Sequence, residues 1–127
     1  MRVFKTKWLA RFTRRAGISD ASLRQAIERL ASGHLDADLG GGIIKQRVAR
    51  DGQGRSGGYR MLIAYRSRDR AVFLYVFAKN ECDNIEPDEL ATLRDLGAVW
   101  LAADVKRITQ ALEDETLQEI TDGPREN

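Results

Sequence analysis

The fold follows from one stretch of the chain, Ala71-Val72-Phe73-Leu74-Tyr75-Val76-Phe77, in which every side chain is apolar or aromatic. A short run rich in β-branched and aromatic residues predicts a strand at the centre of a sheet, here over residues 71–78. Residues 43–49 and 59–66 have the same strand-like character, and the four-residue turn 67–70 joins the last two runs as a hairpin. The sequence therefore predicts a three-stranded, mainly antiparallel sheet.

Two helices are predicted ahead of this sheet, after a short strand near the N-terminus. Between residues 23 and 30, apolar side chains recur at offsets of 3, 4 and 7, and Ser19 is a suitable N-cap. An earlier basic stretch, residues 8–16, also has apolar side chains at helical spacing and is closed by Gly17. The two segments predict a helical hairpin packed on the sheet. The core residues expected from this packing are Leu23, Ile27, Leu30, Phe73 and Val76.

A third helix is expected to start at Pro87, because proline favours the first helical position and acidic residues follow it. The residues expected on its buried side are Leu90, Leu93, Trp100, Leu101 and Val105. After residue 109 the pattern is weaker and predicts only a short helix, with a frayed tail from Gly123. We therefore predict an α+β domain over 1–108 and an acidic C-terminal extension over 109–127. One face of the sheet carries the helical hairpin, and the other face is expected to be open.

Composition limits the classes of function. The chain has 127 residues, of which 43% are hydrophobic, and this suits one domain with a modest core. The single cysteine excludes an internal disulfide, and one cysteine with one histidine cannot form a zinc site. No stretch approaches the roughly 18–20 apolar residues of a membrane span, and nothing resembles a signal peptide. We expect a cytoplasmic protein with no metal, no cofactor and no membrane partner.

Charge is distributed unevenly along the chain. Residues 1–80 hold 17 lysines and arginines against 6 acidic residues, whereas residues 81–127 hold 4 against 13. A basic body with an acidic end suggests a polyanionic partner such as nucleic acid. The alternative is a solvated surface whose charges happen to be uneven.

The strand residues Lys45 and Arg47 are separated by one position, so they share a face of the sheet. Ile44, Gln46 and Val48 take the other face. Arg60 begins the neighbouring strand and Lys79 ends the central one, which brings four cations toward one cleft. The planar guanidinium group of arginine can donate two parallel hydrogen bonds to a phosphate. A single lysine or arginine on a strand is nevertheless more often simply exposed to solvent.

A cluster of this kind could cleave RNA without a metal ion. Cleavage requires removal of the 2′-hydroxyl proton, stabilisation of charge on the phosphoryl oxygens and protonation of the leaving 5′ oxygen. Neighbouring cations disfavour the protonated form of an amine, so the candidate general base is Lys45. Arg47 and Arg60 would clamp the phosphate, and Lys79 could assist the leaving group.

Other residues with chemical potential have structural interpretations. Tyr59, Tyr65 and Phe77 could stack on bases, but burial in the core is the expected role. His34 follows a helix-terminating glycine and is expected to be a surface loop residue. The acidic neighbours of Cys82 disfavour a nucleophilic thiolate.

Four segments resemble the RelE-like toxins of the HigB type over roughly residues 1–105. These segments are Lys5–Trp8, Asp36–Arg47, Gly54–Arg60 and Phe77–Glu81. The resemblance implies a RelE fold, ribosome-dependent mRNA cleavage and a cognate protein antitoxin, often of the helix-turn-helix type.

The resemblance also carries residue roles. Lys45 and Arg47 match the paired basic strand positions of the family, and Arg60 matches the arginine after Gly-Tyr. Better-studied relatives have a second arginine where this chain has Asn80, and a tyrosine where it has Ile85. The general acid is therefore left open: Lys79 takes over, cleavage is slower, or another arrangement serves. The residues predicted to bind RNA around the catalytic set are Arg50, Arg55, Arg66 and Asn80.

Two other classes of function remain open from the sequence. One is a ParE-like toxin that poisons DNA gyrase, against which the basic pair Lys45 and Arg47 argues. The other is a regulatory RNA-binding module without catalysis. Mapping of mRNA ends from translating ribosomes would separate the three.

Overall fold

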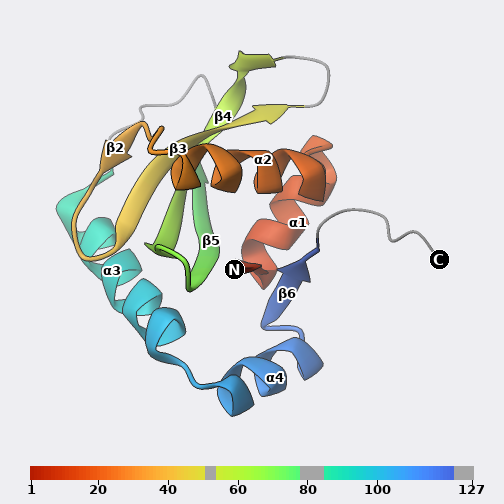
Figure 1. Ribbon diagram of the computed structural model, residues 1–127, viewed down its shortest axis with the longest axis vertical. Helices are drawn as coiled ribbons and strands as arrows, with labels where there is room; N and C mark the ends of the chain where they lie inside the picture. The colour runs from red at the N-terminus through yellow and green to blue at the C-terminus, as the bar shows by residue number, and fades with distance from the viewer. Residues whose placement is uncertain (51–53, 78–84, 122–127) are drawn as a thin grey trace.

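A computed structural model describes residues 1–50, 54–77 and 85–121, apart from the side chains of residues 50 and 54–57. The described chain forms an α+β domain with four helices and one six-stranded sheet (Figure 1). In chain order the elements are β1 (Arg2–Thr6), α1 (Lys7–Ala16), α2 (Asp20–Ala31), β2 (Ala37–Asp38), β3 (Ile43–Arg50), β4 (Gly54–Arg66), β5 (Arg70–Phe77), α3 (Pro87–Ala102), α4 (Val105–Glu113) and β6 (Leu117–Ile120). The predicted α+β class is confirmed.

The sheet has the strand order β2-β3-β4-β5-β1-β6. Strand β1 runs parallel to β5, and the other four pairings are antiparallel, so the sheet is mixed. The predicted central position of residues 71–77 is correct, since β5 lies between β4 and β1. Parallel strands need a long connection, and the chain between β1 and β5 provides one with α1, α2 and the strands from β2 to β4.

The helical hairpin packs on one face of the sheet as predicted. Helix α1 ends at Gly17, whose φ of 71° is left-handed, and the Ser19 hydroxyl accepts a hydrogen bond from the Ser22 N–H at the start of α2. The five predicted core residues, Leu23, Ile27, Leu30, Phe73 and Val76, are all buried in the same cluster. Lys5, itself buried, adds an ion pair of 2.6 Å to Asp20 in the first turn of α2.

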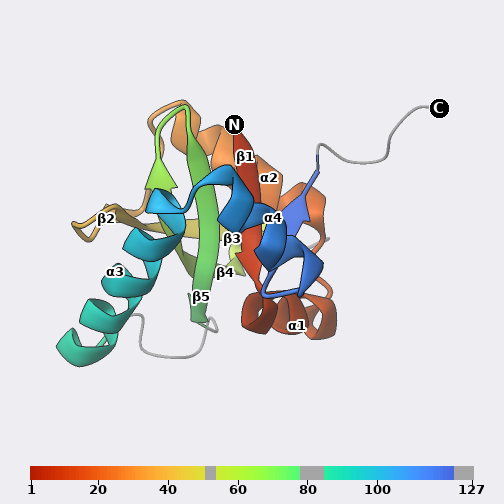
Figure 2. The ribbon, with the colours of Figure 1, turned by 90° about the horizontal axis from the view of Figure 1, so that it is seen from below.

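The expectation of an open second face is wrong. Helices α3 and α4 cover much of that face with a second apolar cluster that includes Trp100, Leu101 and Ile108 (Figure 2). Gly97 brings α3 within contact of the sheet: a Cβ there would lie 2.9 Å from Ile43 Cδ1. The sequence of β5 explains this second layer, because a strand with apolar side chains on both sides needs a packed layer on each face of the sheet.

The C-terminal part also differs from the prediction. Val105 is 68% exposed and starts the separate helix α4, which runs across residue 108. The short helix expected after residue 109 is wrong for residues 117–120, which form strand β6 beside β1. Arg2 and Glu119 join these strands through two hydrogen bonds of 2.9 Å, and the bond from Arg2 lowers the pKa of Glu119. The frayed tail expected from Gly123 lies outside the described residues.

Strand β4 is longer than predicted, since it begins at Gly54 rather than at residue 59. The pairing with β3 shifts between Val48 and Arg50, opposite this extension. At Gly58 a Cβ would lie 2.0 Å from the carbonyl oxygen of Val48, so no side chain fits at this crossing. Gly58 therefore allows the two strands to approach each other closely.

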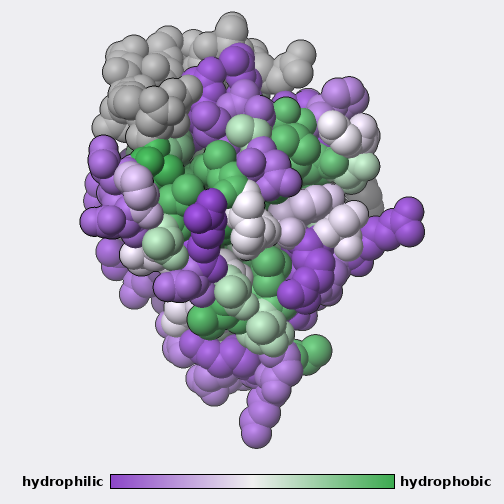
Figure 3. Space-filling view, turned by 90° about the vertical axis from the view of Figure 1, so that its left-hand side faces the viewer, coloured by the Kyte–Doolittle hydropathy of each residue, from purple (hydrophilic) through white to green (hydrophobic). Residues whose placement is uncertain are grey.

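The outer surface of α3 combines charged and apolar side chains, among them Leu96 and Val99, which are 37% and 56% exposed. Figure 3 shows this mixture on the side of the molecule that carries α3 and β2. None of the helices in residues 1–50, 54–77 and 85–121 combines the length and apolar character of a membrane-spanning helix.

Candidate functional site

A tight hairpin between β2 and β3 determines where the loop before β2 lies. Its turn consists of Gly40, Gly41 and Gly42, whose φ angles of 83°, 63° and 83° are all left-handed and favour glycine. The Arg94 side chain from α3 donates hydrogen bonds to the Leu39 and Gly40 carbonyls and holds this turn. The hairpin pairs β2 with Lys45 and Ile44, and the Asp36 N–H donates to the Lys45 carbonyl at 3.1 Å. Asp36 is thereby fixed beside the basic part of β3.

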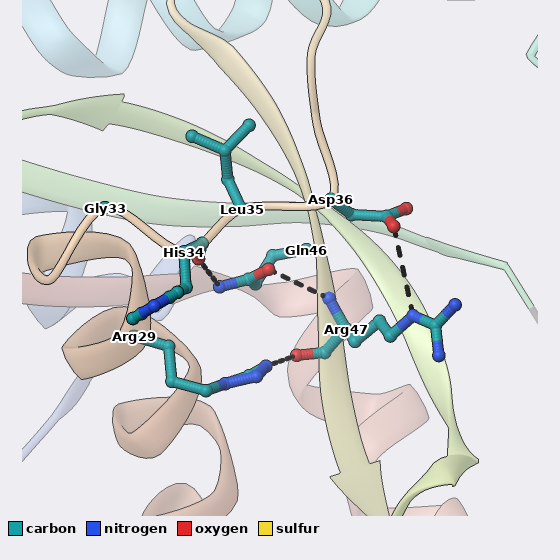
Figure 4. Close-up of a pocket in the computed structure, with 7 residues that line it drawn as sticks. All are labelled: Arg29, Gly33, His34, Leu35, Asp36, Gln46 and Arg47. Atoms are coloured by element: carbon teal, nitrogen blue, oxygen red, sulfur yellow. Dashed lines mark hydrogen bonds and ion pairs between the residues drawn. The ribbon is translucent and has the colours of Figure 1, made fainter.

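Three of the predicted catalytic cations surround the Asp36 carboxylate. Arg60 Nε lies 3.3 Å from its Oδ2 and Lys45 Nζ lies 3.7 Å from the same atom. Arg47 Nε lies 3.9 Å from Oδ1 (Figure 4). The predicted convergence of Lys45, Arg47 and Arg60 is therefore present in the structure. We refer to these three cations with Asp36 as the cation cluster.

The register of the sheet makes the cation cluster costly without an anion. Arg47 and Arg60 are directly opposite each other on β3 and β4. Like charges at opposite positions of an antiparallel pair destabilise the sheet. Asp36 offsets this repulsion, although its separations from the cations exceed the ~2.7–2.9 Å of a good charge-assisted hydrogen bond. Among the residues that the structure describes, one carboxylate thus lies at these long separations from all three cations, an arrangement that suits an anion with more oxygens.

Comparison with protein families gives a match along most of the chain. The family described as the RelE toxin of the RelE / RelB toxin-antitoxin system matches residues 1–120. The chain belongs to the RelE toxin family. No curated protein matches its sequence.

Membership gives this RelE-family protein the role of the toxin in a toxin-antitoxin system, with an antitoxin as its partner. The HigB subtype suggested by the sequence motifs stays a prediction. The match reaches residue 120 and so includes β6. Within the described ranges of this toxin, no three His, Cys, Asp or Glu side chains gather in a group that could hold a metal ion.

The remaining predicted site residues are not all brought to the cation cluster. Arg66 lies at the opposite end of β4, where it donates hydrogen bonds to Asp69 at 3.0 Å and to the Leu101 carbonyl at 3.1 Å. Lys79 and Asn80 lie outside the described residues, as do the side chains of Arg50 and Arg55. The roles assigned to these five residues stay predictions.

Gln46 connects the elements behind the site, a role that no sequence pattern indicates. The side chain is 3% exposed, and its Nε2 donates to the Ala26 carbonyl at 3.1 Å and to the His34 carbonyl at 2.9 Å. Its Oε1 accepts from the Arg47 N–H at 3.3 Å. Gln46 therefore ties α2, the loop before β2 and the backbone of a cluster residue to one another.

A pocket of about 300 Å³ opens beside the cation cluster. Residues of α2, the following loop and β3 line it, namely Arg29, Gly33, His34, Leu35, Asp36, Gln46 and Arg47 (Figure 4). The Arg29 guanidinium donates a hydrogen bond to the Arg47 carbonyl, and this bond connects α2 to β3 at the pocket. Asp36 and Arg47 contribute to the lining, although Figure 4 shows their charged ends pointing away from His34 and Arg29.

The predicted structural roles of the aromatic residues are confirmed. Tyr59 and Tyr65 pack against the first apolar cluster, and Phe77 is buried in the second. Tyr59 also contacts Phe12 edge-to-face, with ring centroids 5.4 Å apart. His34 is an exposed loop residue as expected, but the sequence did not reveal that it lines a pocket.

Proposed function

We propose that this toxin is a metal-independent endoribonuclease that cleaves mRNA on the ribosome, using the cation cluster as its active centre. The observation that carries the proposal is the convergence of Lys45, Arg47 and Arg60 on a single carboxylate. A phosphodiester is also an anion, and it offers more acceptor oxygens to the same donors. Charge stabilisation by fixed donors is commonly the largest contribution to catalysis of this type.

The chemistry assigns one step to each group. Lys45 takes the proton of the ribose 2′-hydroxyl, and the resulting 2′ oxygen attacks the adjacent phosphorus. Arg47 and Arg60 stabilise the negative charge that grows on the phosphoryl oxygens. The bond from phosphorus to the 5′ oxygen then breaks, which leaves a 2′,3′-cyclic phosphate and a 5′-hydroxyl. Lys79 remains our candidate for the group that protonates the leaving oxygen.

Asp36 has a place in this proposal that the sequence did not reveal. Its carboxylate occupies the point at which the three cations meet, so it stands where a bound phosphate would lie. In the free toxin it offsets the repulsion between Arg47 and Arg60. When RNA binds, its phosphate offsets the same repulsion, so Asp36 and the phosphate compete for the three cations.

The proposed activity is tested with purified toxin and a translating extract. We expect mRNA cuts that lie within the codon at the ribosomal A site, and 3′ ends that carry a cyclic phosphate. Chelation of divalent ions after the ribosomal complex has formed should leave the cuts in place. The cognate antitoxin, which we expect to be of the helix-turn-helix type, should suppress them.

Three results would contradict the proposal. Binding to ribosomes without cuts would indicate a regulatory module, and gyrase-dependent DNA damage would indicate ParE-like activity. Cuts that disappear on chelation from preformed complexes would refute metal independence.

Replacement of Asp36 by asparagine should have opposite effects on binding and stability. Asp36→Asn removes the anion that competes with phosphate, so we expect affinity for a short single-stranded RNA to rise about threefold to tenfold. The same change removes the carboxylate that offsets the repulsion between Arg47 and Arg60, and the free energy of unfolding should fall by about 1 kcal/mol. Fluorescence anisotropy at low salt and thermal melts measure the two effects.

Asp69→Asn is the matched control, because Asp69 also pairs with an arginine but at the far end of β4. Asp69→Asn should change neither the affinity for RNA nor the free energy of unfolding appreciably. Weaker RNA binding by Asp36→Asn would refute the competition and indicate that Asp36 is needed for binding.

A further inference from the structure

Helix α3 contacts the glycine turn between β2 and β3, and Figure 1 shows the turn beside this helix. The contact is made by Arg94, which donates hydrogen bonds to the Leu39 and Gly40 carbonyls. We propose that Arg94 is a positioning residue, which determines how strongly Asp36 competes with an RNA phosphate for the cation cluster. This inference rests on the proposed RNA-cleaving function and adds a means by which α3 controls the affinity of the site for RNA.

The glycines of the turn leave room for side chains of α3. A Cβ on Gly41 would lie 3.1 Å from Arg94 Cδ. A Cβ on Gly42 would lie 3.3 Å from Leu101 Cδ1. Arg94 and Leu101 are two helical turns apart on α3, so they lie on the same face of the helix. The turn therefore fits against α3 at two points, and a shift of the helix would be felt by the hairpin.

The β2–β3 hairpin needs such a contact because its own pairing is short. Strand β2 has two residues and lies at the edge of the sheet. Short hairpins are marginally stable by themselves, and glycines lose more backbone entropy than other residues when a turn is fixed. The hydrogen bonds from Arg94 offset this cost, because they join the turn to a helix that is packed on the sheet.

The hairpin transmits the effect of Arg94 to the Asp36 carboxylate. Beside the turn, the Leu39 N–H donates to the Ile43 carbonyl at 2.9 Å. At the other end of β2, the Asp36 N–H donates to the Lys45 carbonyl at 3.1 Å. This pairing holds Asp36 beside the cations. When the Arg94 contacts are lost, local opening of β2 should become more frequent, and the carboxylate should spend less time between the cations.

The sign of the expected effect separates this role from that of an ordinary surface arginine. Removal of a positive charge normally weakens binding to RNA, because fewer counterions are released from the phosphates. Removal of Arg94 should instead strengthen binding, since the cation cluster loses part of the anion that competes with phosphate. A residue that merely stabilises the fold would not produce tighter binding either.

The test measures the affinity of the toxin for a short single-stranded RNA by fluorescence anisotropy at low salt. Arg94→Met keeps the stem that packs on Gly41 but removes the hydrogen bonds, and we expect about twofold to threefold tighter binding. Arg94→Lys keeps a charged donor without the planar fork, so its affinity should lie between those of the wild type and Arg94→Met. In an Asp36→Asn background, Arg94→Met should cause no further tightening, because the competing carboxylate is already absent.

Arg70→Met is the matched control. Arg70 also joins α3 to the sheet, and it donates to the Trp100 and Ala103 carbonyls at 2.6 and 2.8 Å. Its replacement removes one positive charge and two hydrogen bonds to backbone carbonyls but leaves the contacts of Arg94 with the turn in place. Arg70→Met should therefore not tighten the binding of RNA.

Amide hydrogen exchange of the free toxin locates the effect in the hairpin. In Arg94→Met, exchange should accelerate at the Asp36 and Leu39 N–H groups, which pair β2 with β3. In Arg70→Met, the exchange of these two groups should stay as in the wild type.

Three results would overturn the inference. Equal or weaker RNA binding by Arg94→Met would show that Arg94 does not control the competition, while the phosphate site would stand. Tightening of the same size with and without Asp36 would show that the effect does not pass through this carboxylate. If the wild-type toxin binds no RNA, the proposed function falls and the role of Arg94 falls with it.

Discussion

Single substitutions in the cation cluster should abolish toxicity while the toxin remains folded. We expect Arg47→Ala and Arg60→Ala each to lower the rate of mRNA cleavage about a hundredfold, which corresponds to the roughly 3 kcal/mol that a lost donor to transition-state charge can cost. Lys45→Met should have at least this effect, and methionine preserves the packing of a side chain that is only 16% exposed. The measurements are growth arrest on induction and single-turnover cleavage of ribosome-bound mRNA.

Stability should respond very differently to these substitutions. The substitution of a surface residue normally changes the free energy of unfolding by about 0.5 kcal/mol. Here the removal of Arg47 or Arg60 also relieves the repulsion between two cations at opposite sheet positions, so the melting temperature should not fall. Arg14→Ala, on the exposed surface of α1, is the control and should stay toxic. If all three cluster variants are well folded and still cleave mRNA at the wild-type rate, the catalytic assignment is wrong.

Much of the fold could be predicted because local patterns and tertiary packing agree. The stripe Leu23–Leu30, the cap at Ser19 and the apolar run of β5 each indicate one structure, and all three are present. The errors arise where a residue's partner is distant in sequence. Strand β6 has four residues with no clear alternation, and its pairing with β1 joins positions more than 110 residues apart.

The second helical layer could have been inferred from β5 itself. Phe73 is buried on the side of α1 and α2, and Val72 and Leu74 are buried on the side of α3 and α4. A strand with one solvated face would alternate between apolar and polar residues, and this strand does not. The prediction of an open face neglected this pattern and treated the basic residues of β3 as typical of the whole face.

The candidate site shows a similar division. Strand periodicity alone places Lys45 and Arg47 on one face, and the pairing of β3 with β4 adds Arg60. Asp36 could not be placed in the same way, because its position depends on a left-handed glycine turn and on Arg94 from a later helix. Asp36 lies seven positions before the start of β3 and has no distinctive pattern, so only the folded chain reveals that it offsets the charge of the cluster.

Gln46 is the residue whose loss should most strongly affect both stability and the site. Gln46→Met keeps an unbranched side chain of similar volume but removes all three hydrogen bonds. Two of the partners are carbonyls and the third is a backbone N–H, and an unsatisfied buried polar group costs about 1–3 kcal/mol. We therefore expect the free energy of unfolding to fall by about 3 kcal/mol in all, measured by urea denaturation.

The effect of Gln46→Met on activity follows from the same contacts. Without Gln46, the His34 carbonyl and the Arg47 N–H each lose a hydrogen bond, and the loop before β2 keeps only the bond from the Asp36 N–H to the Lys45 carbonyl among the contacts with β3 described above. Cleavage should fall even under conditions where the variant is fully folded. Gln118→Met on β6 is the matched control, because Gln118 makes no side-chain hydrogen bond to the described residues and lies far from the cluster along the sheet. A variant Gln46→Met with wild-type stability would show that water satisfies these backbone groups, and that the buried amide does not hold the site together.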